Sequence, residues 1–219
     1  FCLNYLGGKD AGVFEKHGID LDIDPRPFAG FLAGLPSKQC MTTTYSGMDA
    51  ILKIDEGVDW AIIGGGLTVV QDVLVLKDSP IKTPADLRGK KFGAFSTGAG
   101  SFKAARAAMI DAFKLDVMKD TKLQQVAGPA LTQLLERGDL DAMINISSLN
   151  LAAEAQKDKF RVLFSPNDFW VKKTGFPIVW AAPLVAWDSW VDAAQARAKN
   201  FDAAVAASFE WLEKPENLE

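Results

Sequence analysis

The stretch Gly89-Lys-Lys-Phe-Gly-Ala-Phe-Ser-Thr-Gly-Ala-Gly-Ser-Phe-Lys-Ala-Ala105 decides the fold that the sequence predicts. Lys91–Phe95 is typical of a short buried strand, and Ser96–Gly100 is a turn of small residues. Ser101 is expected to be the N-cap of a helix that runs to about Lys114, because its hydroxyl can accept a hydrogen bond from an early N–H group. A strand that leads through such a turn into a helix presents N–H groups and a positive dipole end, which favours an anion.

The same turn has a second interpretation, which stays open here, because tight strand-to-helix turns use Gly and Ser for conformational reasons alone. Nucleotide motifs do not fit the stretch. Gly98 and Gly100 begin a Gly-x-Gly-x-x-Gly pattern, but Lys103 holds the third glycine position. No glycine is followed by Lys and then Ser or Thr at P-loop spacing, so the sequence does not indicate a nucleotide enzyme.

Composition limits the classes of partner. The chain has 219 residues and a formal net charge of −4, with room for one large or two small domains. No run of 18 apolar residues occurs, so no segment is predicted to span a membrane. Lysines and arginines are scattered, so nucleic acid is not an expected partner. No targeting segment is evident, which leaves the compartment open.

The cysteine and histidine content argues against metal and nucleophile chemistry. A disulfide between Cys2 and Cys40 is neither required nor excluded by their spacing. One His and two Cys are too few for a Cys/His zinc site, and a Ser-His-Asp triad would need His17 as its base. His17 ends a short helix that Gly18 stops, where a cation is favourable, so a structural role is expected. We expect no cofactor, no metal and no catalytic residue.

Helices and strands are predicted to alternate along the whole chain. Phe1–Tyr5 is expected to be a strand, Gly8–His17 a helix, and Ile19–Asp24 a half-exposed edge strand because apolar and acidic residues alternate there. Ser46 and Ser148 are expected to cap the helices that follow them. Further strands are predicted at 39–45, 60–63, 71–77, 123–126, 141–145 and 160–164, and helices at 48–56, 129–136, 149–157 and 188–212. This alternation favours parallel sheets with helices on both faces.

Two features predict two lobes. Gly57-Val-Asp-Trp-Ala-Ile-Ile63 and Gly138-Asp-Leu-Asp-Ala-Met-Ile144 each place a helix-ending Gly and an Asp before a buried strand. Ser79–Pro84 is polar and contains prolines, and Phe176–Trp180 is extended. We expect these two segments to be the crossings between the lobes.

Three segments carry a family resemblance: Lys9-Asp-Ala-Gly-Val-Phe-Glu-Lys-His-Gly-Ile-Asp-Leu-Asp-Ile23, Asp86-Leu-Arg-Gly-Lys-Lys-Phe-Gly-Ala94 and Leu134-Leu-Glu-Arg-Gly-Asp-Leu-Asp-Ala142. In this order they resemble segments of the periplasmic substrate-binding proteins of nitrate/sulfonate/taurine ABC transporters, the family also called NMT1/THI5-like. Gln39-Cys-Met41 departs from the family's pattern in the first lobe.

The resemblance implies an α/β chain with the type 2 periplasmic-binding fold, in which two lobes are joined by two crossover strands and the ligand cleft lies between them. Lobe one would be residues 1–77 completed by 178–219, and lobe two residues 78–177. The implied function is that of a periplasmic or otherwise extracytoplasmic receptor, expected to be a monomer and not an enzyme. It would close by a hinge over a small-molecule ligand and deliver it to an ABC permease in the membrane.

The resemblance places the ligand contacts at strand ends and helix starts: Asn4, Tyr5, Tyr45, Ser46, Ser96, Thr97, Gly98, Ala99, Gly100, Asn145 and Trp180. Backbone N–H groups of Thr97–Gly100 would hold an anionic head, and Tyr5 or Trp180 would cover an apolar body. Core packing for Tyr5 and Trp180, and a turn role for Asn145, stay open. Because Arg26 is the only candidate for an arginine clamp, we expect a monovalent anion or a neutral heterocycle.

Two alternatives to a transport receptor remain. The first is an enzyme on the same fold, of the pyrimidine-synthase or menaquinone-pathway dehydratase type. The synthase type relies on a Cys-rich stretch with His and Lys nearby, whereas Cys2 and Cys40 are far apart here. The second is a ligand-sensing domain of a longer kinase or regulator.

Overall fold

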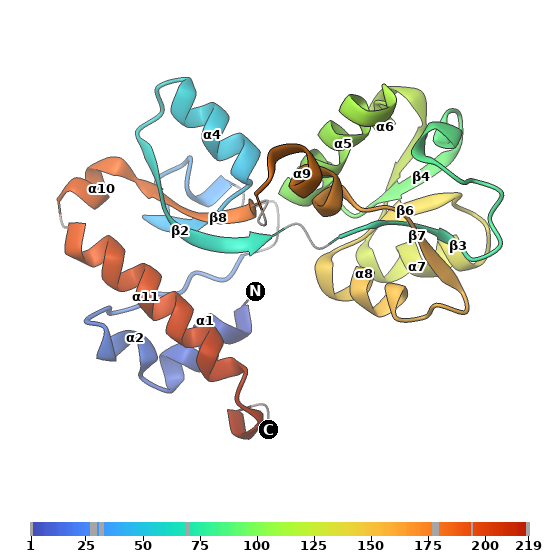
Figure 1. The fold of residues 1–219 in the computed structure, drawn as a ribbon. Helices are drawn as coiled ribbons and strands as arrows, with labels where there is room; N and C mark the ends of the chain where they lie inside the picture. Colours follow the sequence, from blue (N-terminus) through green and yellow to red (C-terminus); the bar gives the residue numbers. More distant parts are fainter. Residues whose placement is uncertain are drawn as a thin grey trace. The chain divides into compact units, whose positions relative to one another are not determined.

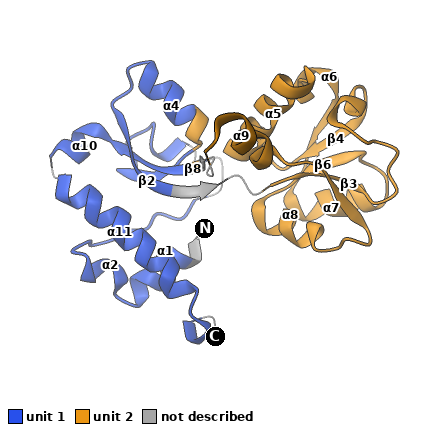
Figure 2. Cartoon of the chain, in the orientation of Figure 1, with its two compact units in different colours: residues 1–45, 49–66, 183–219 blue, residues 46–48, 67–182 orange. Residues whose placement is uncertain are grey.

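The computed structural model describes residues 2–26, 30, 33–68, 71–176, 180–193 and 195–217, and these form two compact units. Unit 1 comprises Phe1–Tyr45, Asp49–Gly66 and Pro183–Glu219, and unit 2 comprises Ser46–Met48 and Leu67–Ala182 (Figure 2). None of the described helices is both long enough and apolar enough to cross a lipid bilayer.

Unit 1 is built on a three-stranded sheet in the order β1 (Thr42–Thr44), β8 (Trp180–Trp187) and β2 (Trp60–Thr68). β1 and β8 are antiparallel. The helices of this unit are α1 (Cys2–Asp10), α2 (Val13–Lys16), α10 (Asp188–Asp192) and α11 (Gln195–Leu212), with α4 (Gly47–Asp55) following β1 (Figure 1).

Successive residues of β8 pack into two different clusters, as expected for neighbours on a strand. Leu184 packs with Phe14 of α2 and Phe201 of α11 in one cluster. Val185 packs with Trp60 and Ala50 in the other, together with Leu35 and Trp187. Helices therefore cover both faces of the sheet.

The N-terminal strand prediction is wrong, because residues 2–10 form α1. Asn4 and Gly8, one helical turn apart, both face Ser208 of α11. Asn4 Nδ2 donates to Ser208 Oγ at 3.1 Å, and a Cβ at Gly8 would lie 2.9 Å from Ser208 Cβ. Packing against a helix from the other end of the chain therefore decides this segment.

The predicted helix over Gly8–His17 is interrupted at Gly12, which has a φ of 69° and precedes α2. Gly18, with a φ of 70°, ends α2 as expected. Ile19–Asp24 is not a strand. The alternation within it is real, since Ile19 is buried and Leu21 packs on the same cluster, but the segment joins no sheet among the described residues.

Unit 2 is built on a five-stranded sheet. Its order is β5 (Lys122–Gln125), β4 (Lys91–Ala94), β6 (Ala142–Ile144), β3 (Val73–Leu76) and β7 (Phe160–Phe164). β4 is parallel to β5 and β6, as expected, whereas β3 is antiparallel to β6 and β7. The prediction of parallel sheets is therefore wrong for β3, and also for β1 with β8. The direction of β3 is set by its antiparallel pairing with β6 and β7, and its connection to β4 contains a 3-10 helix and no crossover helix.

That connection includes Ser79–Pro84, so this segment joins two strands of one sheet and is not a crossing between the units. The pairing of β3 also places residues 73–76 in unit 2, whereas the sequence predicted them in the first lobe. Of the second predicted crossing, Phe176–Trp180, residues 177–179 lie outside the described residues.

Helices cover both faces of the second sheet. Phe92 and Ala94 pack with Phe102 and Met109 of α5 (Gly100–Phe113). Met143 packs on the other face with residues of α7 (Gly128–Glu136) and α8 (Ser147–Glu154). The remaining elements are η1 (Pro84–Leu87), α6 (Val117–Asp120), α9 (Pro166–Thr174) and η2 (Pro215–Asn217).

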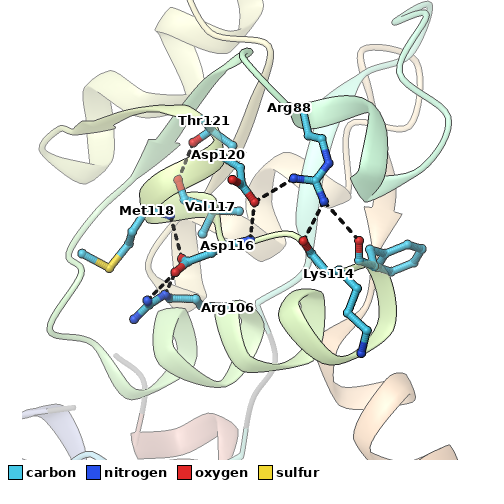
Figure 3. Close-up of polar contacts among 9 residues, drawn as sticks. Arg88, Arg106, Lys114, Asp116, Val117, Met118, Asp120 and Thr121 are labelled. Atoms are coloured by element: carbon cyan, nitrogen blue, oxygen red, sulfur yellow. Dashed lines mark hydrogen bonds and ion pairs between the residues drawn. The ribbon is translucent and has the colours of Figure 1, made fainter.

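A network of charged side chains anchors the C-terminal end of α5 (Figure 3). Arg88 donates to the carbonyl of Lys114 at 2.6 Å and to Asp120 Oδ2 at 2.8 Å. Asp120 accepts the Asp116 N–H, and Asp116 forms a bidentate pair with Arg106 at 2.7 Å for both bonds. The cationic Arg88 satisfies a terminal carbonyl where the helix dipole is negative, so α5 is fixed at this end.

Candidate functional site

Four strands of unit 2 end at one edge of the sheet, here called the carboxyl edge. β5, β4 and β6 are parallel, and β7 runs the same way because β3 is antiparallel to both β6 and β7. Each of the four leads into a helix: β4 into α5, β5 into α7, β6 into α8 and β7 into α9 (Figure 1). Open α/β sheets bind ligands at this edge, so several helix N-termini gather where a ligand is expected.

The turn Ser96–Gly100 is half-buried at this edge, directly after β4. The N–H and hydroxyl of Thr97 donate to Gln125 Oε1 at 3.1 and 3.2 Å. The Gly98 N–H donates to Ser96 Oγ at 3.2 Å, and the Ala99 N–H to the Ser96 carbonyl at 3.3 Å. Three of the N–H groups expected to bind the anion are therefore already engaged within the turn.

The N–H groups available for a ligand are those of the next three residues. Ala99, and not Ser101 as expected, is the N-cap of α5, and Ser101 is buried in its first turn. Lys103 is the first residue whose N–H reaches a helical acceptor, the Ala99 carbonyl at 3.1 Å. Within the described part of the chain, Gly100, Ser101 and Phe102 have no acceptor for their N–H groups. The sequence predicted this helix start, but it placed the N-cap at Ser101, two residues too late, and therefore assigned the free N–H groups to the wrong residues.

Asn145 holds the starts of two neighbouring helices. It is buried after β6, and its Nδ2 donates to the Gly128 carbonyl of α7 at 2.9 Å. Its Oδ1 accepts the Ile146 N–H at 2.8 Å, and its own N–H donates to Asn150 Oδ1 at 2.9 Å. The side chain is thus occupied by protein groups, which supports the turn interpretation. Ile146, and not Ser148, is the N-cap of α8.

Gln71 and Asp72 also lie at the carboxyl edge, since they precede the antiparallel strand β3. Gln71 Nε2 donates to Ser147 Oγ at 2.9 Å. Burial raises the pKa of Asp72 to about 6, the carboxylates of Glu154 and Asp168 act in the same direction, and a hydrogen bond with Ser165 opposes them. Neither residue was predicted as part of the site from the sequence, because only the reversed direction of β3 brings them to this edge.

The predicted contacts from the first lobe fall in two groups. Asn4 and Tyr5 belong to α1 and not to a strand end. Tyr5 stacks on Phe14 at 5.9 Å between ring centroids, and burial followed by the charge of Asp202 raises its pKa to about 12. These contacts support core packing for Tyr5.

Tyr45 and Ser46 do lie where they were expected, between β1 and α4. The ring of Tyr45 packs edge-on against Trp60, at 5.1 Å between centroids. Trp180 is the first residue of β8, and its side chain lies outside the described part.

The other candidate residues have structural partners. Arg26 pairs with Asp24 and donates to Gln39 Oε1, so it is not an open clamp. His17 Nδ1 lies 2.9 Å from the Val13 carbonyl, as expected for a residue at a helix end. Cys40 has a free thiol whose pKa burial raises, which disfavours the thiolate. Among the described residues, no group of three or more His, Cys, Asp or Glu side chains could hold a metal ion.

A surface groove of about 490 Å³ lies at the opposite edge of the same sheet. Lys77, Asp141 and Lys159 line it, and these residues flank the end of β3 and the starts of β6 and β7. It is therefore separate from the carboxyl edge.

The chain consists of two α/β units, each a sheet with helices on both faces. Solved structures that resemble it have the type 2 periplasmic-binding fold. The chain belongs to the NMT1/THI5-like family, whose model matches residues 3–217. This confirms the family and the fold class expected from the sequence.

Solved structures share the fold at low sequence identity. A protein from Bordetella bronchiseptica RB50 is 20% identical, with a TM-score of 0.75 over 97% of this chain and 68% of the other. The periplasmic aliphatic sulphonate binding protein SsuA from Escherichia coli is 18% identical, with a TM-score of 0.71 over 99% and 72%. The alkanesulfonate-binding protein SsuA from Xanthomonas axonopodis pv. citri, bound to MOPS, is 15% identical, with a TM-score of 0.69 over 96% and 71%. No curated protein sequence matches the chain.

Proposed function

We propose that this protein is an extracytoplasmic solute receptor that captures a small anionic ligand and delivers it to an ABC importer. The observation that carries the proposal is the set of N–H groups of Gly100, Ser101 and Phe102, which lack acceptors among the described residues and lie at the carboxyl edge of unit 2. Membership of the NMT1/THI5-like family supports it, as do the sulfonate-binding proteins that share the fold.

The chemistry of the edge favours a monovalent head group. Lys103, in the first turn of α5, is the one Lys or Arg among Ser96–Lys103 and the first turns of α7 and α8. Charge would be balanced by this side chain, by backbone N–H groups and by helix dipoles, each equivalent to about half an elementary charge. A sulfonate, a carboxylate or nitrate fits this supply better than a phosphate dianion. We infer that the units close on the ligand by a hinge, as periplasmic binding proteins do.

The enzyme alternative has less support. Nucleophilic or acid–base chemistry needs an activated group, whereas Cys40 has a raised pKa and His17 lies against a helix carbonyl. Native mass spectrometry of freshly purified protein tests the receptor proposal directly, because a captured ligand should appear as a discrete added mass that denaturation removes.

A second measurement gives the ligand class. A ligand at a hundred times its dissociation constant stabilises the native state by ~2.7 kcal/mol, which for a chain of this size raises the melting temperature by about 5–10 °C. Methanesulfonate, taurine, nitrate and a neutral pyrimidine would be compared. A protein that retains no ligand and responds to none of these compounds, but turns over a pyrimidine precursor, would contradict the proposal.

A further inference from the structure

The sheet of unit 1 ends at β1, and one side of this strand has no neighbour among the described residues. In the order β1, β8, β2, the strand β1 pairs with β8 alone. The Tyr45 N–H donates to the Pro183 carbonyl of β8 at 3.0 Å, and hydrogen-bonded positions alternate along an antiparallel pair. Thr43 therefore bonds to β8, whereas the N–H and C=O groups of Thr42 and Thr44 point away from it. We call these outward groups the outer edge of β1.

The outer edge lacks the partners that buried polar groups need. Within the part of the chain that the structure describes, no hydrogen bond joins the outward backbone groups of Thr42 and Thr44 to another group. Thr44 is only 8% exposed, and Thr42 Oγ1 is buried without a hydrogen-bond partner. Native proteins pair nearly all buried polar groups, and an open sheet edge normally carries charged residues or proline. The Thr-Thr-Thr sequence of β1 has neither, so this edge has the features of an interior strand.

The segment Ile19–Asp24 has the side-chain pattern of a strand but no strand partner in the described chain. Ile19 is buried and Leu21 packs on the same cluster, whereas Asp20 and Asp22 are exposed. This is the two-residue period of a strand with one buried face. In this segment no backbone N–H after that of Ile19 has an acceptor among the described residues. The segment therefore offers a second row of unpaired backbone groups.

The two rows of unpaired groups border one core cluster. Thr44 lies opposite Leu184 in the pairing of β1 with β8, so their side chains are on the same face of the sheet. Leu184 packs with Ile19 in that cluster, and Leu21 packs against it. Because no described backbone hydrogen bond fixes residues 20–24, this segment can move to the far side of an added strand.

We propose that one further β-strand, supplied by the same polypeptide outside residues 1–219, binds between the outer edge of β1 and the segment Ile19–Asp24 and completes the sheet of unit 1. Every second residue of this strand is apolar and faces the cluster that contains Leu184. Basic or uncharged residues alternate with them, because Asp20 and Asp22 are exposed and opposite charges are favourable across a strand pair. A single strand satisfies both rows of backbone groups.

A second copy of the chain is a poorer occupant of this edge. β1 has three residues, so pairing between copies through it buries little of the roughly 1,200 Å² that a stable interface between proteins requires. A strand on the same polypeptide needs no such area, because a short flexible connection gives it an effective concentration in about the millimolar range.

Amide hydrogen exchange of the full-length protein, followed by NMR, tests the proposal. The Thr43 amide faces β8 and is the internal control. The Thr42 and Thr44 amides should exchange within about tenfold of the Thr43 rate, at every protein concentration. Fast exchange at Thr42 and Thr44 would mean that the edge is open and would overturn the proposal. Protection that is lost on dilution would overturn it as well, because the edge would then belong to a second copy.

Two proline variants separate strand pairing from burial alone. Thr42→Pro removes only an outward N–H, which an unpaired edge tolerates, whereas Thr43→Pro removes a bond to β8. With a further strand bound, both variants should lower the urea midpoint of the full-length protein by a similar amount. A Thr42→Pro protein that keeps the parent's midpoint would show that no strand pairs with this edge, and the proposal would be wrong.

Discussion

Gln125 Oε1 accepts two hydrogen bonds from Thr97, one from its backbone N–H at 3.1 Å and one from its hydroxyl at 3.2 Å. The end of β5 thereby fixes the turn that follows β4, one residue before Gly98. The turn precedes α5, so this pair sets how the first N–H groups of α5 are presented.

Gln125→Ala should therefore weaken ligand binding with little effect on folding. Losing hydrogen bonds at an exposed residue should cost about 1 kcal/mol or less in unfolding free energy, while affinity should fall about twofold to tenfold. Calorimetric titration with the sulfonate that gives the largest melting shift measures the affinity. Gln124→Ala is the matched control, since Gln124 is also exposed on β5 and its side chain makes no hydrogen bond to another described residue. Equal affinities for both variants and the parent would show that the turn holds its shape unaided.

Gly98→Asp should abolish anion capture and leave unit 2 folded. Gly98 is not among the glycines with positive φ, so a side chain there causes no left-handed backbone strain. The new carboxylate would lie near the N-terminus of α5, where it is favourable for the helix but repels an incoming anion. The melting shift of about 5–10 °C expected for the parent should vanish.

Gly98→Asn serves as its control, because it adds similar bulk without the charge and should retain most of the shift. A Gly98→Asp protein that binds as tightly as the parent would show that the head group is held elsewhere, for instance near Tyr45 and Ser46.

Asp72 should make stability depend on pH. Burial raises its folded-state pKa to about 6, above the ordinary value of 3.8, so the folded protein prefers the protonated form. The contribution of protonated Asp72 to the free energy of unfolding is fully present below pH ~4 and is lost as the pH rises through about 6. Asp72→Asn should therefore be more stable than the parent at pH 7–8, by about 1 kcal/mol after allowance for solvent screening, with the difference closing near pH 4. Urea unfolding of the parent and of Asp72→Asn from pH 4 to 8 measures this difference. A constant difference across the range would refute the assignment.

Gly93→Ala should destabilise unit 2 through overpacking. A Cβ at Gly93 would lie 2.5 Å from Leu140 Cδ1 and 2.7 Å from Leu131 Cδ2, both in a closely packed cluster. The expected loss is about 1–3 kcal/mol by urea denaturation. Gly65→Ala is the contrasting change, since no heavy atom of the described residues, apart from those of its chain neighbours, lies within 4 Å of its Cβ position. This change should alter stability by less than about 0.5 kcal/mol.

The parts of the fold that depend on near neighbours could be predicted from the sequence. β4, the turn after it and α5 follow one another within a single stretch, and their order was expected. The N-terminal helix could not be predicted, because Asn4 bonds to Ser208, 204 positions away. At the candidate site, the turn was found from its residue types. Gln71 and Asp72 were missed, because the direction of β3 depends on its pairing with β6 and β7 and not on its own residues.

Since β3 runs against its neighbours, its first residues arrive at the carboxyl edge, where Gln71 is tied to Ser147, the first residue of α8. A ligand that draws on the Ser147 hydroxyl competes with Gln71 for the same oxygen. Ligand binding at the carboxyl edge and the hydrogen bond between Gln71 and Ser147, which anchors the chain where it enters unit 2, are therefore thermodynamically linked. Each must change the equilibrium constant of the other by the same factor.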